Sequence, residues 1–244
     1  MGVFQQPARA DPIALLKREI KTLIFDQYGT IVDMQKGLTE VATPFLAAKG
    51  WDGNPSSFVT WWRRTHFENS MIDALCDRGH TPYREIGHRA VSHVMDRCKI
   101  AYSQDEVRAL VGAIEKLKPF PDVVAALGRL KGFGYRLAIL SNGDPDMLAA
   151  AGPHIGFGFD HVISVAQAGA FKPHWRSYAK AEEIVGTERS GCLFVANHAF
   201  DCIGAKSFGM RAAFVDRRRR PFGDTPHQPD IVVADFSELA AKLT

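Results

Sequence analysis

The sequence contains little cysteine. Four cysteines, Cys76, Cys98, Cys192 and Cys202, are scattered through 244 residues without a Cys-x-x-Cys pair. Their spacing matches neither a disulfide framework nor a zinc site. Reduced thiols are typical of cytoplasmic proteins, so we expect a cytoplasmic protein without structural disulfides.

Long hydrophobic runs and an excess of charge of one sign are also missing. The longest apolar runs are far shorter than the roughly 20 residues that cross a bilayer, and MGVFQQPARADPIALLKREI at the start lacks the apolar core of a signal peptide. The 30 Lys and Arg residues nearly balance 27 Asp and Glu residues, which leaves a net charge of +3. We therefore expect no nucleic-acid or membrane partner. The one basic run, Arg217 to Arg220, is expected to be a solvated loop.

Short apolar runs alternate with helical patterns in the second half of the chain. Uninterrupted apolar runs are typical of strands buried on both faces of a parallel sheet, and their alternation with helices predicts an α/β fold. The predicted strands here are YRLAIL (135–140), HVISV (161–165), GCLFVA (191–196), RAAFV (211–215) and DIVVA (230–234). Helices are predicted for DVVAALGRLKGFG (122–134) and WRSYAKAEEIVG (175–186).

Residues 35–118 contain no comparable strand run. Four helical patterns fill them: GLTEVATPFLAAKG (37–50), SSFVTWWRRTHFENSMIDALC (56–76), YREIGHRAVSHVMDRC (83–98) and DEVRALVGAIEKL (105–117). Ser103 opens a Ser-x-x-Glu helix start, and KPFPDV from Lys118 marks the return to the α/β pattern. We predict a core of residues 1–34 and 119–244, interrupted after the first strand by a helical insertion of residues 35–118.

Polar side chains follow the first strand-like run, TLIF (22–25), and three of the predicted strands of the second half. Ligands of open parallel sheets bind at the carboxyl ends of the strands. Taken singly, these residues have ordinary explanations, since an aspartate after a strand is commonly a turn or cap residue and Ser-Asn-Gly is a common turn. Taken together, they predict one shared cleft. The residues are Asp26 after TLIF, Ser141-Asn142-Gly143 after LAIL, Lys172-Pro173 shortly after HVISV, and Asn197-His198 with Asp201 after CLFVA.

These motifs, in this order, resemble the haloacid dehalogenase superfamily from Ile20 onward. FDQYGT, LAILSNGDP and FKPHWRSY are similar to the L-2-haloacid dehalogenase (type II) branch, and LFVANHAFDCIGAKSFGM matches its fourth motif imperfectly. The resemblance implies a Rossmann-like three-layer core with a parallel sheet, carrying an inserted helical cap.

The resemblance also separates this branch from the phosphatases of the superfamily. Those enzymes carry a second aspartate where Tyr28 stands, which protonates an alkoxide leaving group. Halide leaves as a stable anion and needs a pocket with hydrogen-bonding or positive groups instead. The phosphatases also place a Mg²⁺ ligand at the position of Asn197. We therefore expect no required metal and no cofactor.

The reaction implied by the resemblance is hydrolysis of a small (S)-2-haloacid. Asp26 attacks the α-carbon, releases halide and forms an aspartyl ester, which water cleaves to give an (R)-2-hydroxyacid. Lys172 is expected to keep Asp26 ionised. Thr30 and Ser141 are expected to position the reacting groups, and Asp201 is the expected base or water-orienting group. A helix-surface acid is the alternative for Asp201.

The insertion is expected to contribute the halide-binding arginine. In TWWRRTHFE, Arg63 matches the family position and Asn142 is its implied partner. Arg64 is the neighbouring alternative, about 100° away around the helix. On pattern alone, an arginine on such a helix is commonly just solvated.

Three aromatic residues match or neighbour family pocket positions. Tyr178 corresponds to a tyrosine near the site, Phe200 to an aromatic wall of the substrate pocket, and Phe67 is expected to line the pocket from the cap. Plain core packing is the alternative for each.

The fourth motif departs from the family at two positions. The family has a serine where Ala196 stands and an asparagine where His198 stands, and both help to hold the hydrolytic water. His198 is expected to line the site as a hydrogen-bond partner, as a base, or as a residue that only packs against Phe200. The ester-forming step is thus better supported than the ester-hydrolysing step.

Three alternatives to a 2-haloacid dehalogenase stay open at this point. One is a hydrolase of the same branch acting on another small carboxylate, such as azetidine-2-carboxylate or fluoroacetate. A phosphatase is disfavoured by Tyr28 and Asn197, and a non-catalytic scaffold by the presence of Asp26, Lys172 and Asp201. The resemblance further implies a homodimer.

Overall fold

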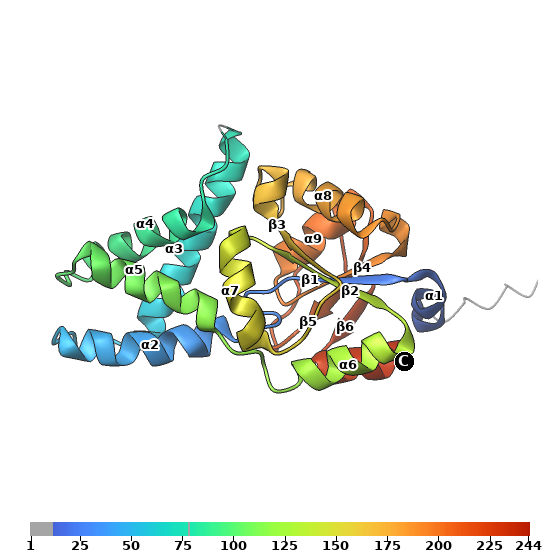
Figure 1. Ribbon diagram of the computed structural model, residues 1–244, viewed down its shortest axis with the longest axis horizontal. Coiled ribbons are helices and arrows are strands. Elements are labelled where there is room, and N and C mark those ends of the chain that lie inside the picture. Colours follow the sequence, from blue (N-terminus) through green and yellow to red (C-terminus); the bar gives the residue numbers. More distant parts are fainter. Residues whose placement is uncertain (1–11, 78) are drawn as a thin grey trace, which may run out of the picture.

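A six-stranded parallel sheet forms the centre of the molecule. The computed structural model describes residues 12–77 and 79–244. All strand pairs are parallel, and the strand order β3-β2-β1-β4-β5-β6 places β1 and β4 in the middle (Figure 1). The strands are β1 (Thr22–Phe25), β2 (Arg136–Ser141), β3 (His161–Ser164), β4 (Cys192–Ala196), β5 (Arg211–Val215) and β6 (Ile231–Val233).

Helices cover both faces of this sheet. Figure 1 shows α6 and the C-terminal helix on one side of the strands and α8 and α9 on the other. The core helices are α1 (Pro12–Glu19), α6 (Val123–Phe133), α7 (Pro145–Ile155), α8 (Trp175–Val185), α9 (Ala199–Phe208) and α10 (Phe236–Leu243). This three-layer α/β arrangement confirms the predicted fold class, and it explains why Leu23, Ile24 and Phe25 of β1 are all fully buried.

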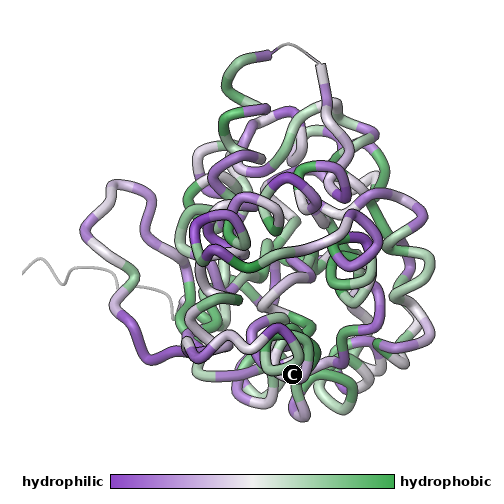
Figure 2. Tube along the Cα trace, turned by 90° about the vertical axis from the view of Figure 1, so that its left-hand side faces the viewer, coloured by the Kyte–Doolittle hydropathy of each residue, from purple (hydrophilic) through white to green (hydrophobic). Residues whose placement is uncertain are grey.

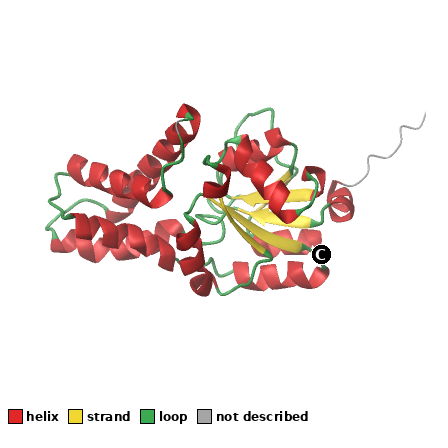
Figure 3. Cartoon of the chain, turned by 45° about the horizontal axis from the view of Figure 1, so that its top comes forward, coloured by secondary structure: helices red, strands yellow, loops and turns green. Residues whose placement is uncertain are grey.

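The chain between β1 and β2 is helical. It contains α2 (Met34–Ala48), α3 (Pro55–Cys76), α4 (Tyr83–Arg97) and α5 (Gln104–Gly112), which pack on one another beside the sheet (Figure 3). Side chains that accept a backbone N–H, including those of Asp33, Asn54 and Ser103, fix where α2, α3 and α5 begin.

One predicted helix of this region is shorter than expected. The pattern DEVRALVGAIEKL indicates a single helix over residues 105–117, but α5 ends at Gly112 and a 3₁₀ turn, Ala113–Lys116, follows. Gly112 is a weak helix former, and Pro119 disfavours helical geometry in the residue before it. The chain can therefore leave the helix early and turn back toward the sheet.

Hydropathy alternates along the helices. Figure 2 shows hydrophobic and hydrophilic stretches following each other along the coils, as expected for helices with one buried and one solvated side. None of the helices in residues 12–77 and 79–244 is long and apolar enough to cross a membrane. All four cysteines are free thiols, as their spacing predicts.

Candidate active site

Asp26 lies at the carboxyl end of the central strand β1, where its side chain is nearly buried. Its backbone N–H donates to the Val195 carbonyl at 3.0 Å, which continues the pairing of β1 with β4 by one residue. The Thr30 hydroxyl donates to Asp26 Oδ2 at 2.6 Å, and Lys172 Nζ donates to Asp26 Oδ1 at 2.9 Å. Both carboxylate oxygens are therefore held by donors.

These donors keep Asp26 ionised. Burial by itself would raise the pKa of Asp26, but the Lys172 ammonium, the His198 imidazole and the Thr30 hydroxyl together lower it well below the usual range. A carboxylate that is charged yet shielded from water is a potential nucleophile.

Lys172 joins two carboxylates at the floor of the site. Its Nζ donates to Asp201 Oδ2 at 2.6 Å and to the Leu140 carbonyl at 3.0 Å, in addition to Asp26. Burial lowers the pKa of this amine, but Asp201 and Asp26 outweigh burial and raise it above its ordinary value. Lys172 is thus a protonated ammonium at neutral pH. All three of its N–H groups have an acceptor, and its side chain is almost completely buried.

Asp201 lies behind the lysine, not at the cavity surface. Tyr178 OH donates to its Oδ1 at 2.6 Å and Lys172 occupies its Oδ2. Both Asp201 and Tyr178 are fully buried, and neither is among the residues that line the cavity. The structure thus rules out a helix-surface position for Asp201, and it places Tyr178 as a partner of this carboxylate and away from the substrate space.

The turn after β1 is fixed by β4. The Asn197 side chain donates to the Gly29 carbonyl at 3.0 Å, and the Asn197 backbone N–H donates to the Thr30 hydroxyl at 2.9 Å. Gly29 has a φ of +87°, and a Cβ at this position would lie 3.0 Å from the His198 ring. Glycine is therefore required here both by the backbone conformation and by space.

Tyr28 forms an apolar wall of the site. Its ring stacks on Tyr83 with centroids 5.5 Å apart and planes 7° apart, and its buried hydroxyl has no hydrogen-bond partner among the described residues. A Cβ at Gly143 would lie 2.5 Å from this hydroxyl, so glycine leaves the room it needs. Burial raises the pKa of Tyr28 well above its ordinary value, and the ring stays neutral.

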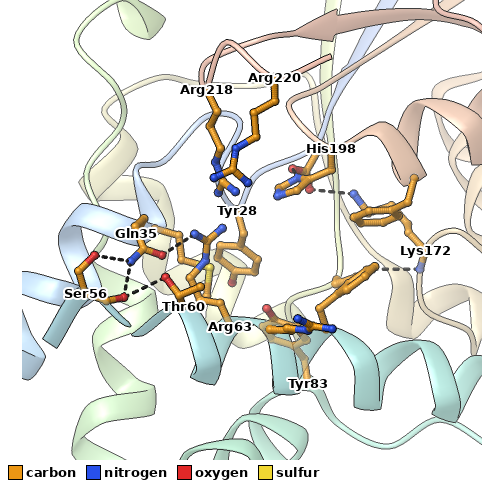
Figure 4. A pocket seen from close by; sticks show the side chains of 16 residues that line it. Tyr28, Gln35, Ser56, Thr60, Arg63, Tyr83, Lys172, His198, Arg218 and Arg220 are labelled. Carbon is orange, nitrogen blue, oxygen red and sulfur yellow. Dashed lines mark hydrogen bonds and ion pairs between the residues drawn. The ribbon is translucent and has the colours of Figure 1, made fainter. Parts of the chain in front are cut away.

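A cavity of about 560 Å³ opens in front of Asp26, between the sheet edge and α2 and α3 (Figure 4). It is far larger than the space a bound water needs, and such concave sites are the usual place for small ligands. The residues that line it are Asp26, Tyr28, Met34, Gln35, Ser56, Thr60, Arg63, Arg64, Phe67, Tyr83, Asn142, Lys172, His198, Phe200, Arg218 and Arg220.

Arg63 reaches this cavity from α3. Its guanidinium donates to Gln35 Oε1 at 2.9 Å, and one of its nitrogens lies against Gly29. Burial, and then the nearby Arg218, lower the pKa of Arg63 to about 10, which leaves it protonated at neutral pH. Arg64 also lines the cavity, but its guanidinium is paired with Glu68 at 2.7 Å.

His198 contacts the carboxylate of Asp26 directly. Its Nδ1 lies 3.4 Å from Asp26 Oδ2, while its ring is 5.5 Å from that of Phe200. Phe200 in turn packs on Phe67 of α3 at 4.3 Å. His198, Phe200 and Phe67 therefore all line the cavity, with His198 as the member nearest the carboxylate.

Ser141 and Asn142 have different surroundings. Asn142 lines the cavity and its side-chain oxygen accepts the Lys172 backbone N–H at 3.1 Å. The Ser141 hydroxyl is buried and accepts the Gly143 N–H at 3.2 Å. Ser141, Thr30 and Asn197 are thus close to the site without forming its cavity surface.

Several residues that line the cavity were not predicted from the sequence. Tyr83 and Gln35 carry no local signal, because their positions depend on how α4 and α2 pack. The basic run is visible in the sequence, but its pattern predicts only a solvated loop. Arg218 and Arg220 are exposed, as expected of a solvated loop, and both also line the cavity, which the sequence did not indicate.

Arg217 of the same run holds the loop in place and does not line the cavity. Its guanidinium forms two hydrogen bonds with Asp122, at 3.0 and 3.1 Å, and its Nε donates to the Thr30 carbonyl at 3.1 Å. It lies 3.9 Å over the Phe120 ring. The loop after β5 is therefore anchored to the turn that carries Thr30.

The donor set of the site does not resemble a metal centre. Within residues 12–77 and 79–244, no three His, Cys, Asp or Glu side chains are grouped as metal ligands. Asn197 is held by Gly29, and the two carboxylates of the site share the Lys172 ammonium. The independence from metal stays a prediction.

Several known proteins of similar sequence and architecture are dehalogenases. The family model of the haloacid dehalogenase-like hydrolases matches residues 20–209. The chain is 35% identical over 202 residues to an (S)-2-haloacid dehalogenase of Xanthobacter autotrophicus, with 81% of this chain and 76% of that protein covered. It is 30% identical over 218 residues to haloacetate dehalogenase H-2 of Moraxella sp. strain B, with 88% and 94% covered.

The tertiary structure agrees with these sequence matches. An L-2-haloacid dehalogenase from Xanthobacter autotrophicus, solved with chloropropionic acid covalently bound, superimposes with a TM-score of 0.79 at 30% identity, covering 91% of this chain and 97% of that one. The chain therefore belongs to the haloacid dehalogenase-like hydrolases, in the branch of the L-2-haloacid dehalogenases.

Proposed function

We propose that this protein hydrolyses small (S)-2-haloacids to (R)-2-hydroxyacids and halide through an ester on Asp26. The observation that carries the proposal is a buried, ionised Asp26 that is held by Lys172 and Thr30 and faces a cavity lined by Arg63 and Tyr28. The names of the relatives, (S)-2-haloacid and haloacetate dehalogenases, support the same substrate class.

In the first step, an Asp26 oxygen displaces halide at the α-carbon of the substrate. A C–O bond forms, the carbon–halogen bond breaks, and the halide departs with the bonding electron pair. Lys172 and Thr30 fix the carboxylate in place, which lowers the entropic cost of attack. Arg63 and Asn142 on the cavity wall stabilise the departing halide and the substrate carboxylate. Tyr28 excludes water and supplies no proton, which halide does not need.

In the second step, water attacks the carboxyl carbon of the Asp26 ester and releases the 2-hydroxyacid. Asp201 is sealed behind Lys172 and Tyr178, so it acts on the water through Lys172 or after a local rearrangement. His198 faces the cavity and touches Asp26 Oδ2. We assign His198 the role of holding the hydrolytic water, in place of the family asparagine.

The proposal also covers the domain organisation, the cofactor requirement, the compartment and the oligomeric state. The α2–α5 region, residues 35–118, acts as the cap domain over a core of residues 1–34 and 119–244. The reaction requires neither metal nor cofactor, since the leaving group needs no screening cation. The protein works in the cytoplasm as a homodimer, as the family resemblance implies.

Halide release tests the reaction class. Purified protein is incubated with L-2-chloropropionate, chloroacetate and fluoroacetate in the presence of EDTA, and halide is measured. We expect chloride from at least L-2-chloropropionate. The proposal fails if no substrate yields halide while a phosphate ester is hydrolysed in an EDTA-sensitive reaction.

Isotope labelling tests the nucleophile. A single turnover in H₂¹⁸O places label in Asp26 if water cleaves the ester at its acyl carbon, and peptide mass spectrometry locates it. Asp26→Asn removes halide release, with Asp52→Asn, an exposed aspartate that does not line the cavity, as a matched carboxylate control. Label found only in the hydroxyacid product would show direct attack of water on the substrate.

A further inference from the structure

Three arginines line the cavity without forming an ion pair with a carboxylate of the described residues. Arg63 comes from α3, while Arg218 and Arg220 come from the loop after β5. The hydrogen bond of the Arg63 guanidinium is instead to the neutral side-chain amide of Gln35. Arg64, by contrast, is neutralised by Glu68.

The three cations lie close enough to repel one another. Partial burial and then Arg220 lower the pKa of Arg218, just as Arg218 contributes to the lowered pKa of Arg63. Figure 4 shows the side chains of Arg218 and Arg220 directed into the cavity, toward Arg63. Asp26, which also lines the cavity, is already paired with Lys172. The charge of Asp33 raises the pKa of Arg63 and of Arg218, opposing this repulsion, but among the described residues Asp33 forms no ion pair with either arginine. An anionic ligand would relieve this repulsion.

The cavity has room for more than the smallest haloacids. A molecule the size of 2-chloropropionate displaces about four waters, roughly 120 Å³ at about 30 Å³ each. The cavity measures about 560 Å³, so most of it is left over. Asp26 and Lys172 line the core side of the cavity, and Arg218 and Arg220 enter it from the loop after β5, above Tyr28 and on a different side from Lys172 (Figure 4).

We propose that Arg218 and Arg220 form a second anion subsite, and that the preferred substrates are 2-haloacids with a second carboxylate at the far end, that is, 2-halodicarboxylates. Guanidinium groups bind carboxylates through paired, charge-assisted hydrogen bonds. The chemistry at Asp26 is the same for a monoacid and a diacid. This substrate class rests on the proposed dehalogenase function.

Kinetics with chain-matched substrates test the subsite. For the native protein we expect kcat/KM to be at least about tenfold higher with 2-chloroglutarate than with 2-chloropentanoate, which is the gain expected from one charge-assisted contact. The variant with both Arg218→Gln and Arg220→Gln loses this preference and keeps its rate on 2-chloropentanoate. Arg219→Gln, which removes the same charge from the same loop outside the cavity, keeps the preference.

Binding of unreactive acids tests the subsite without turnover. Calorimetry should show glutarate binding at least about tenfold more tightly than pentanoate, with the difference lost in the double variant. Equal affinity of the two acids overturns the subsite, and so does an equal loss in Arg219→Gln, which would mean a general charge effect. If no haloacid yields halide but glutarate shows the expected preference, the dehalogenase function fails and the anion subsite stands.

Discussion

Replacing Lys172 with methionine tests how the site keeps a buried aspartate reactive. The ammonium makes three hydrogen bonds, to Asp26, Asp201 and the Leu140 carbonyl, at 2.9, 2.6 and 3.0 Å. Methionine has a similar length and no charge, so Lys172→Met leaves two buried carboxylates without a counterion.

The expected cost follows from the burial of all three groups. Breaking a buried ion pair by removing one partner costs about 3–5 kcal/mol of folding stability. In the variant, burial is no longer opposed by a cation, so the pKa values of Asp26 and Asp201 both rise. A carboxyl whose pKa is raised in the folded state binds more protons than the unfolded chain does, and the variant is therefore destabilised less at pH 5 than at pH 8.

The raised pKa of Asp26 also lowers the activity of the variant. A protonated Asp26 is no nucleophile, so single-turnover halide release from L-2-chloropropionate falls at least about tenfold at pH 7. It recovers in part as the pH is raised and Asp26 ionises. The native protein shows no such recovery, because the pKa of Asp26 is low and that of Lys172 is high.

Urea denaturation at pH 5 and pH 8, with quenched-flow halide release over the same range, measures both effects. A stability loss that is equal at the two pH values, or a rate loss that does not recover with pH, would refute the electrostatic role of Lys172. If Lys172→Met does not fold, the combination with Asp201→Asn leaves one carboxylate. That variant should be the more stable of the two.

Four further results are expected. His198→Ala should release one halide per protein in a rapid burst and then turn over about 100-fold more slowly, whereas an equal loss in both phases would mean that His198 does not act on the ester. In Arg63→Lys, which keeps the charge but loses the planar fork, halide release should fall about tenfold, and unchanged kinetics would remove Arg63 from the halide site. The halide burst of the native protein should be flat between about pH 6 and 9, since Asp26 stays ionised and Lys172 protonated; a strong pH dependence of the burst would contradict these shifts. Burial lowers the pKa of His66 from 6.5 to about 3, so the unfolded chain takes up the proton first on acidification. The free energy of unfolding should therefore fall by about 2 kcal/mol between pH 7 and pH 5. Urea denaturation at the two pH values measures this fall, which should be absent in His66→Gln.

The sequence alone predicted the sheet and the inner end of the site. Uninterrupted apolar runs require burial on both faces, and parallel strands bring their carboxyl ends to one edge, so Asp26, Lys172 and Asp201 had to converge. The motif order identified the family, and Tyr28 separated this branch from the phosphatases. These features are local, or follow from a topology that local patterns define.

Tertiary structure decided which of these groups meet the substrate. Whether Asp201 faces water or hides behind Lys172 and Tyr178 depends on side-chain packing between α8 and α9, which no strand-end pattern contains. Likewise, Arg218 and Arg220 look like an ordinary solvated run in the sequence. They become part of the cavity because β5 lies beside β4, and because Arg217 joins the loop both to the Thr30 carbonyl in the turn after β1 and to Asp122 at the start of α6. Such long-range contacts join segments far apart in the chain, so only the folded structure shows where the charge of that loop is directed.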